Sequence, residues 1–90
     1  MTVSYKLLVK KSAERELKSI PKTLLSKLIG KIRALSSEPR PHGCEALAGS
    51  DKHYRVRQND YRIVYTVSHQ DHVVYVDYIR HRKDVYRGIE

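Results

Sequence analysis

Arginines on two neighbouring β-rich segments are spaced so that they could hold one phosphate. Strand alternation in His53–Gln58 places Arg55 and Arg57 on one face. If Asn59–Asp60 is a two-residue hairpin loop, Arg57 lies directly across from Arg62 on the next strand. Like charges opposite each other destabilise a sheet, so an anion between the arginines explains this pairing better than folding does. The alternative is that ordinary salt bridges neutralise the arginines, through Asp60, Asp77 or Asp84.

A second group of reactive side chains lies near the end of the sequence. Arg80 could hold a phosphate with parallel N–H donors, His81 could carry a proton near neutral pH, and Tyr86 could stack on an unpaired base. Such groups can cut RNA, because its own 2′-hydroxyl attacks the adjacent phosphorus once a base removes the hydroxyl proton. Cations then stabilise the charge on the phosphorane, and an acid protonates the leaving oxygen. The sequence therefore favours cleavage of RNA without a metal or other cofactor.

The excess of positive charge favours a polyanionic partner. The formal net charge is +8 and the isoelectric point is about 9.8, which is typical of chains that bind nucleic acid. Besides the catalytic candidates, five cations are expected to contact RNA phosphates, namely Lys27, Lys31, Arg33, Lys52 and Arg82. For cations on a helix, an ordinary solvated face is the alternative.

Several features point to the cytoplasm and away from membranes and metals. No stretch approaches the roughly 20 apolar residues that a spanning helix needs. The segment Met1–Lys11 lacks the apolar run and cleavage site of a signal peptide. A single cysteine, Cys44, allows no internal disulfide, which suits a reducing compartment. The histidines form no paired metal-ligand motif with it, so no metal site is expected.

The first half of the sequence predicts a strand and a helical hairpin. Apolar and polar residues alternate over Val3–Val9, which is typical of a strand. Ser12 is placed to cap a short helix, and Pro21 interrupts that helix and begins the next one. Leucine and isoleucine then recur at helical spacing as far as Leu35. Two prolines and a glycine in Glu38–Gly43 end the helical region.

The second half predicts an antiparallel β-meander packed on the helices. Three β-rich runs are separated by short polar connections, and these runs are His53–Gln58, Tyr61–Ser68 and His72–Arg80. The whole chain, residues 1–90, is therefore interpreted as one α+β domain. Cross-strand core packing explains the tyrosines at strand spacing better than a base-stacking platform does, and these are Tyr61, Tyr65, Tyr75 and Tyr78.

Several segments together resemble the toxin family named after RelE. They are Glu38–Gly43, Ala46–Gly49, Tyr54–Arg57, Asp60–Tyr65 and His81–Tyr86. The similarity runs over nearly the whole chain, including the strand, the helical hairpin and the meander. Members of that family are toxins of type II toxin–antitoxin pairs that cut mRNA in the ribosomal A site. The resemblance thus implies a cognate acidic antitoxin, mRNA and the ribosome as partners, with oligomerisation mainly through the antitoxin.

The resemblance also implies roles for single residues. Arg55 and Arg57 fall where the best-known RelE-type toxins have two lysines that serve in phosphate contact and proton abstraction. Arg62 matches the arginine that stabilises transition-state charge. Arg80 falls at the position of the arginine proposed as general acid, and Tyr86 matches the tyrosine that stacks on the substrate base.

The two arginines in place of lysines change the expected chemistry. An arginine is essentially never deprotonated, so Arg57 is a poor general base and is expected, with Arg55, to clamp phosphate only. His81, His53 and Lys52 then remain as candidate proton carriers. Other toxins of this superfamily use a histidine near the C-terminal tyrosine as general acid, which favours His81.

Two other functions stay open. A ParE-like poison of DNA gyrase shares this fold, although such toxins generally lack the ending that runs here from Arg80 to Tyr86. A non-catalytic RNA-binding or ribosome-associated module would use the arginines to grip phosphates without proton transfer.

Overall fold

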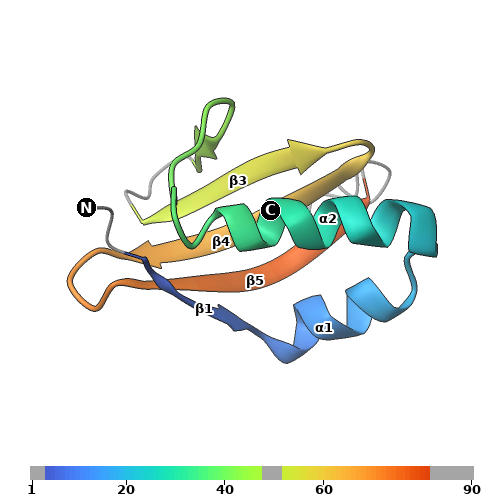
Figure 1. Ribbon diagram of the computed structural model, residues 1–90, viewed down its shortest axis with the longest axis horizontal. Coiled ribbons are helices and arrows are strands. Elements are labelled where there is room, and N and C mark those ends of the chain that lie inside the picture. Colours follow the sequence, from blue (N-terminus) through green and yellow to red (C-terminus); the bar gives the residue numbers. More distant parts are fainter. Residues whose placement is uncertain (1–3, 48–51, 82–90) are drawn as a thin grey trace.

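One mixed sheet with two helices on one of its faces makes up the part of the protein described by the computed structural model, residues 4–47 and 52–81 (Figure 1). The elements follow the order β1 (Lys6–Val9), α1 (Lys11–Lys18), α2 (Lys22–Ala34), β2 (Glu45–Ala46), β3 (His53–Gln58), β4 (Tyr61–Ser68) and β5 (Val73–His81). Within those ranges the strand order is β1-β5-β4-β3-β2. The predicted α+β class, the helical hairpin and the meander are therefore confirmed.

The β3–β4 hairpin has the predicted two-residue loop. Asn59 has a φ of 58°, a left-handed conformation that asparagine tolerates well. Gln58 pairs with Tyr61 on either side of the loop, and Arg57 pairs with Arg62 in the next position. The loop chemistry thus sets the register of the whole hairpin.

The first strand is the edge of the sheet and pairs with the last one. β1 runs parallel to β5, with Lys6 opposite Val73 and Val9 opposite Val76. The amide of Tyr5 donates to the carbonyl of Ser36 after α2, which ties the start of β1 to the helical layer. Parallel strands need a long connection, and here the chain between β1 and β5 includes both helices and the strands β2, β3 and β4.

The helix α1 does not begin as the sequence predicted. Ser12 was expected to be its N-cap, but the helix begins at Lys11, and Lys10 holds the extended capping position. The hydroxyl of Ser12 instead donates to the backbone carbonyl of Asp77 on β5 at 2.7 Å. The side chain of Ser12 therefore links the helix to the sheet and does not cap the free amides at the start of the helix.

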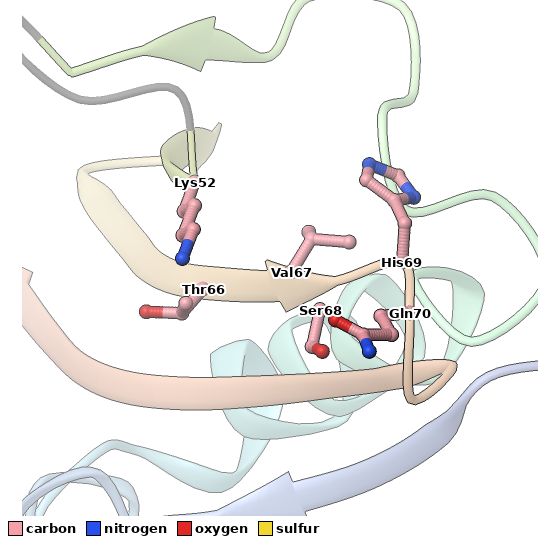
Figure 2. A pocket seen from close by; sticks show the side chains of 6 residues that line it. All are labelled: Lys52, Thr66, Val67, Ser68, His69 and Gln70. Carbon is pink, nitrogen blue, oxygen red and sulfur yellow. The ribbon is translucent and has the colours of Figure 1, made fainter.

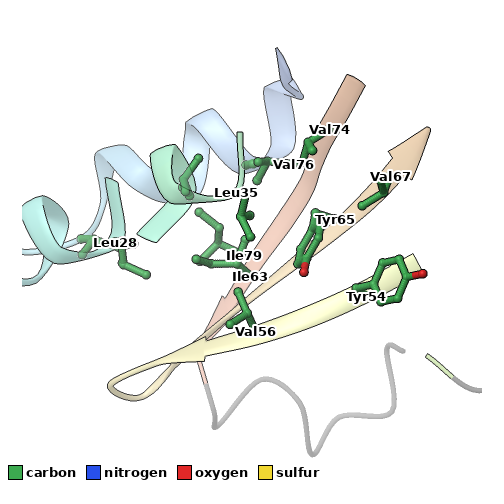
Figure 3. Close-up of a cluster of buried hydrophobic side chains, with 13 residues drawn as sticks. Leu28, Leu35, Tyr54, Val56, Ile63, Tyr65, Val67, Val74, Val76 and Ile79 are labelled. Carbon is green, nitrogen blue, oxygen red and sulfur yellow. The ribbon is translucent and has the colours of Figure 1, made fainter. Parts of the chain in front are cut away.

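The core lies between the helices and one face of the sheet. Figure 3 shows Leu28 and Leu35 of the helical region facing side chains of the strands. Tyr65 and Ile79 are fully buried there, so every neighbour they have is a protein atom. The other buried strand residues of this cluster are Tyr54, Val56, Ile63, Val67, Val74 and Val76.

The tyrosines divide between the two faces of the sheet. Tyr65 is buried and Tyr61 packs against the core, as predicted. For Tyr75 and Tyr78 the prediction of core packing was wrong, because their half-buried side chains belong to the face that turns away from the helices. An irregularity in β5 at Asp77 reverses the alternation there, as Tyr65 pairs with Val76 whereas Val64 pairs with Tyr78.

The hydroxyl of Tyr65 ties the core to the loop after α2. It donates to the carbonyl of Pro39 at 2.8 Å. Burial raises the pKa of Tyr65 well above its ordinary value of 10.0, and the neighbouring thiol of Cys44 adds to the shift. The phenol therefore stays protonated and keeps donating well above neutral pH.

We expect Tyr65→Phe to lower the free energy of unfolding by about 1 kcal/mol at neutral pH, because the Pro39 carbonyl loses its donor. The folded-state pKa is raised, so the contribution of the phenol is complete below about pH 10 and is lost as pH rises further. The difference between wild type and variant should therefore shrink above about pH 10. Urea unfolding of both proteins between neutral pH and pH 11 measures it. A gap that widens with pH would contradict the assignment.

Candidate functional site

Three arginines form a continuous row across the three central strands, near the end of the sheet that carries the β3–β4 loop. Arg57 pairs with Arg62, and Arg62 pairs with Arg80 on its other side. Adjacent strands lie about 4.8 Å apart, so three positive side chains leave the same face within about 10 Å. We call Arg57, Arg62 and Arg80 the arginine row. Its side chains lie on the face opposite the helices, because Val56, Ile63 and Ile79 next to them are buried in the core.

No carboxylate neutralises the centre of this row within residues 4–47 and 52–81. Arg62 is half-buried and makes no hydrogen bond or ion pair there. Arg57 donates from Nε to the carbonyl of Asn59 at 3.1 Å, which leaves its terminal nitrogens for a ligand. The Nε of Arg80 is buried without a hydrogen-bond partner, and its guanidinium stacks on the ring of Tyr78 with its carbon 4.5 Å from the ring centre. The row has the charge and geometry of an anion site.

The ion pairs of Asp77 and Glu45 involve cations outside the arginine row. Asp77 contacts the Nζ of Lys10 at 2.9 Å. Glu45 contacts the Nε of Arg55 at 3.2 Å, and Arg55 lies two pairs further along the hairpin, about 7 Å from the row. Arg55 therefore shares the face of the row but is engaged by a carboxylate. Asp84 lies outside the described residues.

The proton-carrier candidates do not gather at the row. His81 directly follows Arg80 but belongs to the other face, where its ring packs edge-on against Tyr61 with centroids 5.1 Å apart. His53 shares the face of the row, yet it lies four residues along β3 from Arg57, or about 13 Å. Arg82 and Tyr86, predicted to bind and stack on RNA, fall outside the described residues.

The remaining cations lie in two other places. Lys27 and Arg33 are exposed and Lys31 is half-buried on α2, which covers the face of the sheet opposite the row. Lys52 precedes β3 and lines a pocket of about 410 Å³ together with Thr66, Val67, Ser68, His69 and Gln70 (Figure 2). This pocket is at the far end of β4 from Arg62. The predicted RNA contacts therefore do not form a single surface with the row.

Sequence reasoning missed the environment of Arg80. Tyr78 was assigned to the core, whereas it forms the aromatic support beneath the Arg80 guanidinium. Asp77 was considered only as a salt-bridge partner for arginines. The available signal was a single carboxylate inside an otherwise apolar and aromatic run, Val73–Ile79, because a charge buried in a strand needs a specific partner.

Across the described ranges, His, Cys, Asp and Glu form no group of three or more that could hold a metal ion. None of the helices in those ranges has the length and apolar character needed to cross a membrane.

Comparison with known proteins assigns the family. A family model described as the ParE toxin of the type II toxin–antitoxin system parDE matches residues 7–86. RelE1, a protein of Methanocaldococcus jannaschii named as a toxin, is 30% identical over 83 residues, which cover 89% of this chain and 92% of the relative.

Solved structures agree with this assignment. A chain of the archaeal RelE–RelB complex from Pyrococcus horikoshii has a TM-score of 0.80 at 27% identity, covering 88% of this chain and 96% of that chain. A mutant of the E. coli toxin RelE in the free state has a TM-score of 0.75 at 25% identity, covering 93% of this chain and 92% of that chain. Fold and family model define this chain as a toxin of the type II toxin–antitoxin class. It belongs to the RelE/ParE superfamily, and the solved structures named here are of RelE proteins.

The row predicts an unusual effect of removing a charge. We expect Arg62→Gln to raise the melting temperature at low ionic strength, because it removes the repulsion of Arg62 by Arg57 and by Arg80. A gain of about 0.5 kcal/mol in the free energy of unfolding corresponds to a few degrees. Inorganic phosphate should stabilise wild type more than the variant, since the anion binds between the arginines of the folded state.

Thermal denaturation at low and high salt, with and without phosphate, measures both effects. Arg33→Gln removes the same charge from an exposed position on α2 and serves as the control. Equal responses of the two variants to phosphate would count against an anion site in the row.

Proposed function

We propose that this toxin is a metal-independent endoribonuclease that cuts mRNA on the ribosome. The observation that carries the proposal is the arginine row, in which Arg62 has an arginine on each side and no carboxylate partner among the described residues. A sheet gains nothing in stability from such a row, whereas a phosphodiester that enters it gains several charge-assisted hydrogen bonds. Membership of the RelE/ParE superfamily supports the same reading.

In the proposed reaction the 2′-hydroxyl of the substrate attacks the adjacent phosphorus. A new bond forms between the 2′-oxygen and phosphorus, and the bond from phosphorus to the 5′-oxygen breaks. Charge on the non-bridging oxygens increases in the transition state, and the guanidinium of Arg62 at the centre of the row stabilises it. The flanking Arg57 and Arg80 position the phosphate with their planar donor groups.

Proton transfer needs a group other than the row, because arginine side chains stay protonated. Arg80 can donate hydrogen bonds to the leaving 5′-oxygen but is a weak acid. His81 is adjacent to Arg80 at the end of β5 and half-buried against Tyr61. We propose that it takes the proton of the 2′-hydroxyl and returns it to the leaving 5′-oxygen, which requires its ring to turn from Tyr61 to the face of the row. Tyr86 is proposed to stack on the substrate base.

The cations of α2 are proposed to bind ribosomal RNA. Lys27, Lys31 and Arg33 lie on the helical layer, on the other side of the sheet from the row. Because these cations and the row lie on opposite faces of the sheet, we propose that the two faces bind different RNAs. A message in the row and ribosomal RNA along α2 would make cleavage depend on the ribosome. Lys52 and Arg82 are proposed as additional phosphate contacts.

We expect cleaved messages to end in a 2′,3′-cyclic phosphate upstream and a 5′-hydroxyl downstream, and cleavage to resist EDTA beyond the magnesium that the ribosome needs. Arg62→Ala should slow single-turnover cleavage about a hundredfold, because Arg62 stabilises charge that increases in the transition state. It should barely weaken ribosome association, which the cations of α2 are proposed to provide. End-labelled messages on purified ribosomes, followed by rapid quench, measure both.

Lys27→Ala is the matched control, because it should weaken ribosome association in a salt-dependent way without changing the rate of the bound complex. Products with 5′-phosphates, or an Arg62→Ala protein that cuts as fast as wild type, would refute this mechanism. His81→Gln with an unchanged pH profile would move the proton carrier elsewhere and leave the role of the row intact.

An acidic antitoxin is the proposed partner in the resting cell. The solved P. horikoshii protein is a RelE–RelB complex, and a net charge of +8 on this chain favours an acidic polypeptide. We expect co-expression with a neighbouring small acidic gene product to give a stable complex in which cleavage is suppressed. Co-purification and the cleavage assay test it, and growth that continues when the chain alone is expressed at high level would contradict toxicity.

One observation favours a second candidate function. The matching family model is that of ParE toxins, and a ParE-like protein would poison DNA gyrase instead of cutting mRNA. Amino-acid incorporation and DNA damage after induction separate the two functions, since a ribonuclease stops translation first.

A further inference from the structure

The strand β5 carries an extra residue where it pairs with β4. Tyr65 is opposite Val76 and Val64 is opposite Tyr78, so Asp77 has no partner of its own on β4. This is a β-bulge, in which two residues of one strand face one residue of the other. It lies three residues before Arg80, within the strand that supplies the third member of the arginine row.

The bulge decides which face Arg80 occupies. Val74 and Val76 are buried against the helices, and strict alternation would send Tyr78 and Arg80 to the same side. The extra residue reverses the alternation, so that Ile79 is completely buried and Arg80 pairs beside Arg62 on the other face. Without the bulge, the row would lose Arg80 to the core.

Asp77 is held in the bulge by three other elements. Its Oδ2 accepts a hydrogen bond from the hydroxyl of Thr66 on β4 at 2.6 Å. Its Oδ1 lies 2.9 Å from the Nζ of Lys10, between β1 and α1. Its backbone carbonyl accepts from the hydroxyl of Ser12 in α1 at 2.7 Å. Asp77 is only 8% exposed, so its charge is stable there because these partners are present.

The carboxylate fixes the position of the extra residue. Burial of Ile79 requires one inserted residue between Val76 and Ile79, but a hydrophobic pattern alone does not say which. The contacts of Asp77 with Thr66 and Lys10 place the insertion before Tyr78. Tyr78 and Arg80 then leave the same face, where the guanidinium stacks on the ring at 4.5 Å.

We propose that Asp77 is a positioning residue of the toxin, which holds Arg80 in the arginine row by fixing the bulge in β5. Asp77 bonds to Thr66 and pairs with Lys10 and takes no part in the reaction itself. It acts on the substrate phosphate only through Arg80. The catalytic consequence rests on the proposed ribonuclease function, whereas the effect on the position of Arg80 does not.

The test combines structure with a double-mutant cycle. In Asp77→Asn, two-dimensional NMR should show loss of the cross-strand contacts between Arg62 and Arg80 and of the ring-current shift that Tyr78 imposes on the Arg80 side chain. Single-turnover cleavage should fall about tenfold in wild type but less than about twofold when Arg80 is already alanine, because the two changes act through one group. Thr66→Val removes only the hydrogen bond from the Thr66 hydroxyl to the Asp77 carboxylate. This milder variant replaces Asp77→Asn if that protein does not fold.

Asp71→Asn is the matched control, because Asp71 is an exposed carboxylate in the turn after β4 that contacts Ser68. It should leave the cross-strand contacts and the cleavage rate unchanged. Intact Arg62–Arg80 contacts in the Asp77 or Thr66 variant, or an equal loss of rate with and without Arg80, would overturn the positioning role. If the wild-type chain does not cut RNA, the ribonuclease proposal fails, and the NMR comparison still decides whether Asp77 positions Arg80.

Discussion

The register between β3, β4 and β5 is the constraint on which the rest of the structure depends. A slip of one residue would turn the buried Ile63 and Tyr65 outward and carry Arg62 into the core. The Asn59–Asp60 loop fixes the register on one side of β4, and the bulge at Asp77 fixes it on the other. The arginine row is thus a product of strand pairing, and all three of its members lie within strands.

The arginine row lowers the stability of the sheet in which it lies. Like charges across strands oppose the pairing that brings them together, and arginine cannot relieve the repulsion by losing a proton. The opposing force is burial on the other face, where Leu28 and Leu35 cover Ile63 and Ile79 (Figure 3). In a chain of 90 residues the margin for such a conflict is small. A phosphate bound in the row, as proposed, would offset this repulsion.

Local sequence patterns predicted much of this arrangement. Contacts between residues far apart in the chain could not be predicted from such patterns. A two-residue loop and period-two alternation were enough to place Arg57 opposite Arg62. The parallel pairing of β1 with β5 joins the two ends of the fold, and no local pattern records it. The bulge adds one residue to an apolar run, so the faces of Tyr78 and Arg80 did not follow from alternation alone. Ser12 looked like a helix cap because its partner, Asp77, lies 65 residues away in the chain.

The presence of arginine at all three positions of the row also limits how the site can be controlled. A lysine in a crowded cationic site can lose its proton near neutral pH, whereas a guanidinium cannot. The charge of the row is therefore constant across physiological pH, and any pH dependence of a reaction there must come from another group, such as His81. Because its charge does not change, the row can be inhibited only by a partner that binds over it. A partner that covers Arg62 with a carboxylate would both block the phosphate position and relieve the repulsion across β4, so inhibition and stabilisation of the fold would arise from the same contact.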